Sequence, residues 1–371
     1  MSETGERLAW GWVAHLRDGG TTTWRDWRAA ETGAGESHGR YLPGAQQLEL
    51  LRRLNLAGRP SAELAQRVLA ASAPGRGMPD LQLVGASDES AFGPRPIEPT
   101  DLPDAELTRV ATGLIAEDVV ALGTPPGSRA GLPRPWRRRY RLVGDPWLAD
   151  PIRTELVHRG RPPGGRGSTV FVLGTDLATM LADAWTARSF AEGGPGWGEW
   201  LRSFVGSPRV PLRADLVQAA EVWSRRVGPT RVEIVLDPTL LPRLVGVRRP
   251  LPAPPAYSAD AVDLARRVGA ALGLLVQPDQ RAGLLRHGLG PRLRHAPGLP
   301  VSVPPEHLGW VQRRAVRMRD ALLSAGYAVH GDPDALVPPP ESGSVAPDDD
   351  RVLALALRLL VEPAVRIRRG E

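Results

Sequence analysis

Residues 170–185 read VFVLGTDLATMLADAW, and this stretch decides the fold class. Its first four residues form an apolar run with two β-branched side chains, which is typical of a buried strand. The next three, Gly-Thr-Asp, make a turn, and apolar residues at helical spacing follow it. A strand that passes through a short turn into a helix is the repeating unit of a parallel α/β sheet.

The same order of strand, turn and helix recurs along the chain. Further strands are predicted at 140–143, 232–236 and 327–330, each followed by Gly-Asp-Pro or Asp-Pro. Helices are predicted from 146 to 158, 213 to 227, 258 to 272 and 305 to 325. We therefore expect an α/β fold: a three-layer parallel sheet flanked by helices.

The remainder of the chain divides around this sheet. Residues 1–131 predict a mostly helical N-terminal region, with helices at 42–57, 61–71 and 103–122 that end at glycine or alanine. Residues 132–337 form the expected α/β domain. Residues 338–371 are expected to be a linker followed by a docking segment. The linker, up to residue 350, is low in apolar residues, and the apolar run at 352–361 is expected to pack on the rest of the protein.

The candidate site lies where the predicted strands end. Its residues are Gly144, Asp145, Gly174, Thr175, Asp176, Asp237, His330 and Asp332. Ligands of open α/β sheets bind outside the carboxyl ends of the strands, so the carboxylates could converge on one crevice. An aspartate after a strand also caps the following helix, and capping is the interpretation that we favour for each aspartate taken singly.

Composition excludes several kinds of chemistry. The 371 residues include no cysteine, and all 47 basic residues are arginine, so disulfides, thiolate metal sites, Schiff-base lysines and the phosphate-binding P-loop motif are excluded. The seven histidines are scattered, and we expect neither a metal nor a cofactor. A net charge of +6 is mild for this length, which makes nucleic acid an unlikely partner. No apolar run is long enough to span a membrane, and we expect a cytoplasmic protein.

Two local motifs have competing interpretations. Residues 35–39 match G-x-S-x-G, but no buried strand precedes them and no helix follows, so a hydrolase is rejected. The helices at 42–57 and 61–71 could form a helix-turn-helix with Gln66 and Arg67 on the recognition helix; an ordinary αα-hairpin is preferred. The arginines at 137–139 and 141 fit a solvated strand edge better than a phosphate site. The tryptophans at 10, 12, 24, 27, 197 and 200 could include sugar-stacking platforms, though packing is their commoner use.

Two segments of the chain resemble actinobacterial sulfotransferase-family proteins. Residues 170–185 look like the strand-turn-helix segment of that family. Residues 310–337, with Arg314, Met318 and the run GYAVHGD at 326–332, look like its C-terminal segment, and the helix at 48–55 is similar to another of its helices. The resemblance implies a P-loop-like fold and a site for the donor 3′-phosphoadenylyl sulfate.

The same comparison identifies where this chain departs from the family. The resemblance implies a basic phosphate loop after the first strand and an arginine in the later turn. Here the two places hold Gly144-Asp145-Pro146 and Thr175. We expect a degenerate relative without sulfate-donor binding. Its partner is not specified by the sequence, and a glycan or another small molecule is one candidate. The alternatives are a metal-assisted or glycan-modifying transferase that uses the strand-end carboxylates, and a helix-turn-helix DNA-binding regulator.

Overall fold

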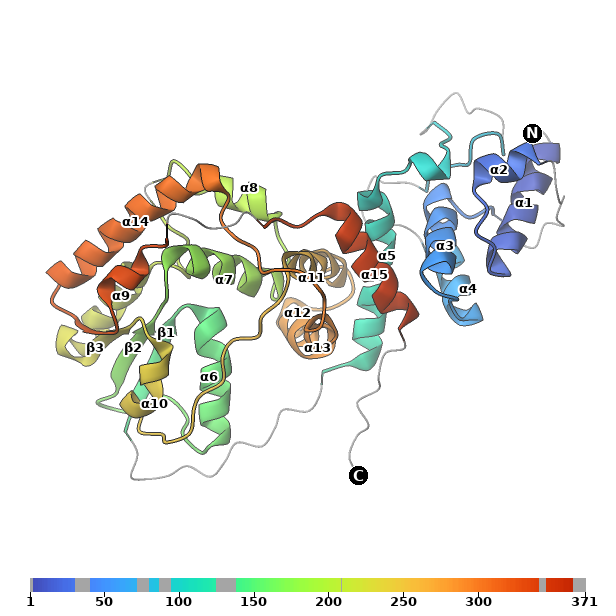
Figure 1. Cartoon of the computed structure of the whole chain (residues 1–371). Helices are drawn as coiled ribbons and strands as arrows, with labels where there is room; N and C mark the ends of the chain where they lie inside the picture. The colour runs from blue at the N-terminus through green and yellow to red at the C-terminus, as the bar shows by residue number, and fades with distance from the viewer. Residues whose placement is uncertain are drawn as a thin grey trace. The chain divides into compact units, whose positions relative to one another are not determined.

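The structure of the chain, a computed structural model, describes residues 3–30, 41–71, 80–86, 95–124, 138–207, 209–339 and 345–362. The chain forms two compact units (Figure 1). Residues 1–124, 263–296 and 347–371 make the first unit, and residues 125–262 and 297–346 make the second. The division differs from the linear one expected from sequence, because two later segments group with the N-terminal helices.

The second unit contains the expected parallel sheet. Its strands are β1 (Tyr140–Gly144), β2 (Thr169–Leu173), β3 (Val232–Val235) and β4 (Ala328–His330), in the spatial order β1-β2-β3-β4. All three pairings are parallel, with Leu142 opposite Phe171 and Val172 opposite Ile234. The α/β prediction is confirmed, and each strand agrees with its predicted range to within one residue at either end.

Helices between the strands cover both faces of this sheet. They are α6 (Pro146–His158), α7 (Leu177–Ser189), α8 (Trp197–Arg202), α9 (Leu216–Val227), α10 (Leu241–Leu244) and α14 (Pro305–Ser324), with the 3-10 turns η2 (Pro229–Arg231), η3 (Pro238–Leu240) and η5 (Pro333–Leu336). On one face α6 and α10 pack on Tyr140, Leu142 and Phe171. Arg141, which points the other way, lies over Trp223 of α9 at 5.5 Å. The three-layer arrangement is therefore present.

The helix α7 does not pack along a face of the sheet. It begins directly after β2, and Asp183 near its middle hydrogen-bonds to Asp145, which follows the last residue of β1. The helix thus runs across the carboxyl ends of both strands, as Figure 1 shows. This position determines what the strand ends can do.

The first unit is helical in its described residues. It contains α1 (Glu3–Arg17), α2 (Trp24–Ala29), α3 (Ala45–Ala57), α4 (Ala62–Ala70), η1 (Pro99–Asp101), α5 (Asp104–Leu122), α12 (Pro278–Gly283), the π-helical turn η4 (Leu284–Leu289), α13 (Gly290–Leu293) and α15 (Asp349–Val361). The chain passes from the second unit to the first within α11 (Ala259–Leu272). The mostly helical N-terminal region is confirmed.

The C-terminal helix explains why the ends of the chain belong to one unit. Seven residues of α15, among them Val352, Leu353 and Leu360, are buried, and α15 packs on α5. Asp348 caps the helix, so the linker predicted at 338–350 is too long at its C-terminal end. Elsewhere in this unit an isolated parallel bridge joins Leu83 to Ile97.

Candidate functional site

All four strand-end aspartates cap the turn or helix that follows them. Asp145 accepts from the backbone N–H groups of Trp147 and Leu148, at 2.9 and 3.4 Å. The other three make the same kind of bond: Asp176 with the N–H of Thr179, Asp237 with that of Thr239, and Asp332 with that of Asp334, each at 2.9 Å. These bonds satisfy backbone donors that a helix start leaves free.

The glycines of the first two turns are explained by close packing. Gly144 has φ +97°, and a Cβ built on it would lie 2.2 Å from the carbonyl oxygen of Leu173, so the position requires glycine. A Cβ on Gly174 would lie 2.5 Å from Leu216 of α9. The N–H groups of Asp145 and Gly174 both donate to the neighbouring strand. The backbone of these turns is thus occupied by the protein itself.

One aspartate takes part in a second interaction. Asp145 is 1% exposed, and its Oδ2 meets no N–H or hydroxyl donor in the described part of the chain. Its neighbour is the partly buried carboxyl group of Asp183, on α7, with which it hydrogen-bonds. Two ionised carboxylates have no donor between them, so this bond requires a proton on one of the two groups.

The pKa values of this acid pair, Asp145 and Asp183, are both raised. Burial, the charge of Asp145 and the nearby Asp176 raise the pKa of Asp183 to about 9. Burial raises the pKa of Asp145 to about 6, against the lowering effect of its hydrogen bonds from Asp183 and the α6 N–H groups. At neutral pH the acid pair therefore holds one proton and one negative charge.

The candidate residues His330 and Asp332 have separate partners. His330 Nε2 lies 2.6 Å from Oε2 of Glu233, on the adjacent strand β3, whereas Asp332 caps η5. The hydroxyl of Thr175 is buried and has no partner among the described residues. The candidate residues therefore share the strand-end edge without converging on a single group.

Sequence reasoning missed Asp183 and Glu233. Asp183 is the one charged residue in the helix between Leu177 and Ala187, and a lone carboxylate in an apolar helix was the available signal. In the part of the chain that the structure describes, no group of three or more His, Asp or Glu side chains is placed to hold a metal ion.

The other motifs serve packing. Arg67 of the hairpin formed by α3 and α4 pairs with Asp118 and Glu117 of α5, at 2.8 and 3.3 Å. Among the tryptophans considered as sugar platforms, Trp27 is half-buried, whereas five are buried: Trp10, Trp12, Trp24, Trp197 and Trp200. The G-x-S-x-G match at 35–39 lies outside the described residues, and none of the described helices is long and apolar enough to cross a membrane.

Comparisons of the chain with protein families, with curated proteins and with solved structures gave no match.

Proposed function

We propose that the chain is a cytoplasmic relative of the P-loop-like sulfotransferase proteins that has lost sulfate-donor binding at its strand ends and acts as a small-molecule-binding protein. The observation that carries the proposal is the acid pair, Asp145 and Asp183, beneath α7 at the end of β1. A donor with several phosphate groups requires free N–H donors and cations at that place.

Hydrogen bonding at the strand ends argues against such a donor. Phosphates bind to the free N–H groups at a helix N-terminus. At α6 those groups are bonded to Asp145, and at α7 the N–H of Thr179 is bonded to Asp176. To reach these N–H groups, a phosphate would have to displace the capping carboxylate. That carboxylate is itself an anion, and it would lose its hydrogen bonds without finding other donors.

The local charge argues in the same direction. The acid pair carries one negative charge near neutral pH, and Asp150 and Asp176 add to the field around it. Like charges repel, so a phosphate here would meet carboxylates where binding requires cations. Glycine turns that pack directly on Leu173 and Leu216 add a steric obstacle.

The test is binding of 3′-phosphoadenylyl sulfate and of its desulfo product, followed by calorimetry and by thermal unfolding. A ligand at a hundred times its dissociation constant stabilises a protein by about 2.7 kcal/mol, which is a shift of several degrees for a domain of this size. We expect no saturable heat and no shift for the natural chain. Saturable binding that strand-end variants abolish would refute the proposal.

Two variants sharpen this test. Asp145→Asn with Asp183→Asn removes both carboxyl groups of the acid pair, while Asp237→Asn changes a strand-end cap outside it. If only the double variant bound the sulfate donor, the negative charge of the acid pair would be the reason why the natural chain does not bind it. Stabilisation of the natural chain by Mg²⁺ or Mn²⁺, absent in Asp183→Asn, would instead favour the metal-assisted or glycan-modifying transferase.

A further inference from the structure

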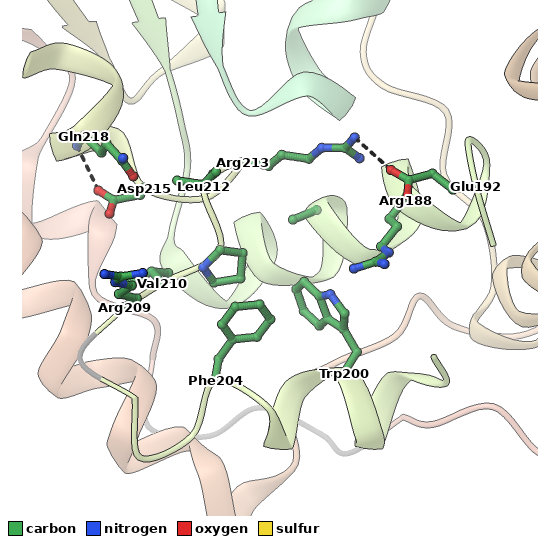
Figure 2. A pocket seen from close by; sticks show the side chains of 12 residues that line it. Arg188, Glu192, Trp200, Phe204, Arg209, Val210, Leu212, Arg213, Asp215 and Gln218 are labelled. Carbon is green, nitrogen blue, oxygen red and sulfur yellow. Dashed lines mark hydrogen bonds and ion pairs between the residues drawn. The ribbon is translucent and has the colours of Figure 1, made fainter. Parts of the chain in front are cut away.

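A pocket of about 720 Å³ opens in the second unit between α7, α8 and the segment that leads into α9 (Figure 2). It is separate from the acid pair, although α7 contributes to both. Ala184 and Arg188, one helical turn apart on α7, line the pocket, whereas Asp183 bonds to Asp145. The other walls come from Trp200 and Phe204 and from residues 209–218.

One wall of the pocket is aromatic. Trp185, Trp197 and Trp200 follow one another with ring centroids 5.6 Å apart, and Phe204 lies edge-on to Trp200 at 5.2 Å. The tryptophans are buried, and Phe204 is the half-exposed end of the series. Figure 2 shows the Phe204 ring beside that of Trp200, on one side of the pocket. The series is thus a rigid support that presents an aromatic surface.

Arg188 extends from α7 into the same space. Its Nε is buried and has no hydrogen-bond partner among the described residues. The side chain lies against Gly194, where a Cβ would come within 2.9 Å of Nε, and φ of +115° also favours glycine there. The Nε atom is thus covered by the protein, and packing holds the guanidinium group in place at the wall of the pocket.

The remaining charges limit the charge of that ligand. Arg209 and Arg213 also line the pocket, against Glu192 and Asp215. Arg213 forms an ion pair with Glu192, at 3.6 Å, and Asp215 already accepts from the N–H of Gln218. Three cations and two carboxylates leave one net positive charge. This balance suits a monoanion, whereas a nucleotide bisphosphate would place extra negative charge against the two carboxylates.

We propose that this pocket binds a small aromatic carboxylate, with its ring against Phe204 and Pro211 and its carboxylate at Arg188. A carboxylate matches the planar guanidinium fork of Arg188 and can accept two parallel hydrogen bonds from it. The apolar wall supplies the surface that a flat ring covers. The inference rests on the proposed small-molecule-binding role and names the ligand class.

The experiment measures binding of 1-naphthoate to the full chain by calorimetry, with 1-naphthamide as the neutral probe of the same shape. We expect saturable binding of the carboxylate, at least about tenfold tighter than the amide, since hydrogen bonds to charged groups contribute that much. Arg188→Gln should weaken 1-naphthoate by about tenfold or more and leave 1-naphthamide unchanged. 1-Naphthyl phosphate, which carries more negative charge, should bind more weakly than the carboxylate.

The matched control is Arg202→Gln, an exposed arginine on α8 that does not line the pocket. It should bind 1-naphthoate as the natural chain does. Circular dichroism checks folding, and Arg213→Gln, whose side chain is 42% exposed, repeats the charge test if Arg188→Gln does not fold. Equal affinity for the acid and the amide, equal losses in Arg188→Gln and Arg202→Gln, or no saturable binding would overturn the inference.

The two proposals fail in different ways. Binding of the desulfo product that Arg188→Gln abolishes but the strand-end double variant leaves intact would overturn the carboxylate assignment and make this a nucleotide pocket. Binding of the desulfo product that only the strand-end double variant abolishes would show that the strand ends still bind the donor. That result would overturn the proposed function and leave the inference about this pocket unaffected.

Discussion

Replacing Asp183 by asparagine should remove a pH dependence of stability that the acid pair creates. In the folded chain the pKa of Asp183 is raised to about 9, chiefly by burial, and that of Asp145 to about 6. In the unfolded chain both carboxyl groups ionise near the ordinary aspartate pKa of 3.8. At pH values between the unfolded and the folded pKa values, the folded chain holds more protons than the unfolded chain. The stability of the folded chain therefore falls as the pH rises through this range.

The magnitude follows from the number of protons. Between about pH 6 and pH 9 the folded acid pair holds one extra proton, on Asp183, which corresponds to about 1.4 kcal/mol of lost stability for each pH unit. Asparagine at position 183 offers an amide donor to Oδ2 of Asp145 and takes up no proton. The stability of Asp183→Asn relative to the natural chain should therefore rise by about 4 kcal/mol from pH 6 to pH 9.

Urea unfolding at intervals between pH 5.5 and pH 9 measures this difference. The difference between the two free energies of unfolding, variant minus natural chain, removes the contributions of the histidines and the other carboxylates, which both proteins share. Asp237→Asn, an exposed strand-end cap, serves as the control and should follow the natural chain at every pH. Parallel curves for Asp183→Asn and the natural chain would show that the acid pair holds no extra proton, and the reasoning would fail.

Two further predictions concern caps and ion pairs, both measured by chemical unfolding. Asp237→Ala should cost about 1 kcal/mol, whereas Asp237→Asn should stay within about 0.5 kcal/mol of the natural chain, because asparagine caps equally well; equal losses would exclude a capping role. Glu49→Gln should cost about 3 kcal/mol, since it leaves the buried Arg52 without its counter-charge, while Glu221→Gln, in an exposed pair with Arg225, should be nearly neutral; a neutral Glu49→Gln would contradict this reasoning.

The elements that were predicted correctly depend on neighbours in the sequence. The run at 170–173 is apolar throughout and is followed at once by a turn, so the strand β2 is marked locally. Capping by Asp176 and Asp237 likewise involves N–H groups only two or three residues away. Such features are determined within a few residues, and sequence reasoning can identify them.

The acid pair depends instead on where a helix runs. Asp145 and Asp183 lie on different elements, and they meet because α7 turns across the strand ends and does not pack along the sheet. Nothing near Asp183 in the sequence specifies that path. The pocket lined by Arg188 and Phe204 also depends on tertiary structure. Its residues Arg188 and Arg213 are brought together by the segments between α7 and α9.

The strand order explains why no crevice forms where the sequence suggested one. In doubly wound sheets a ligand enters where the strand order reverses, because the loops on either side of that point run apart. Here the order β1-β2-β3-β4 never reverses. The space above β1 and β2 is therefore available to α7, and the carboxylate that meets Asp145 comes from that helix. With the strand ends closed in this way, the pocket between Ala184, Arg188 and Phe204 is the place where we propose that a ligand binds.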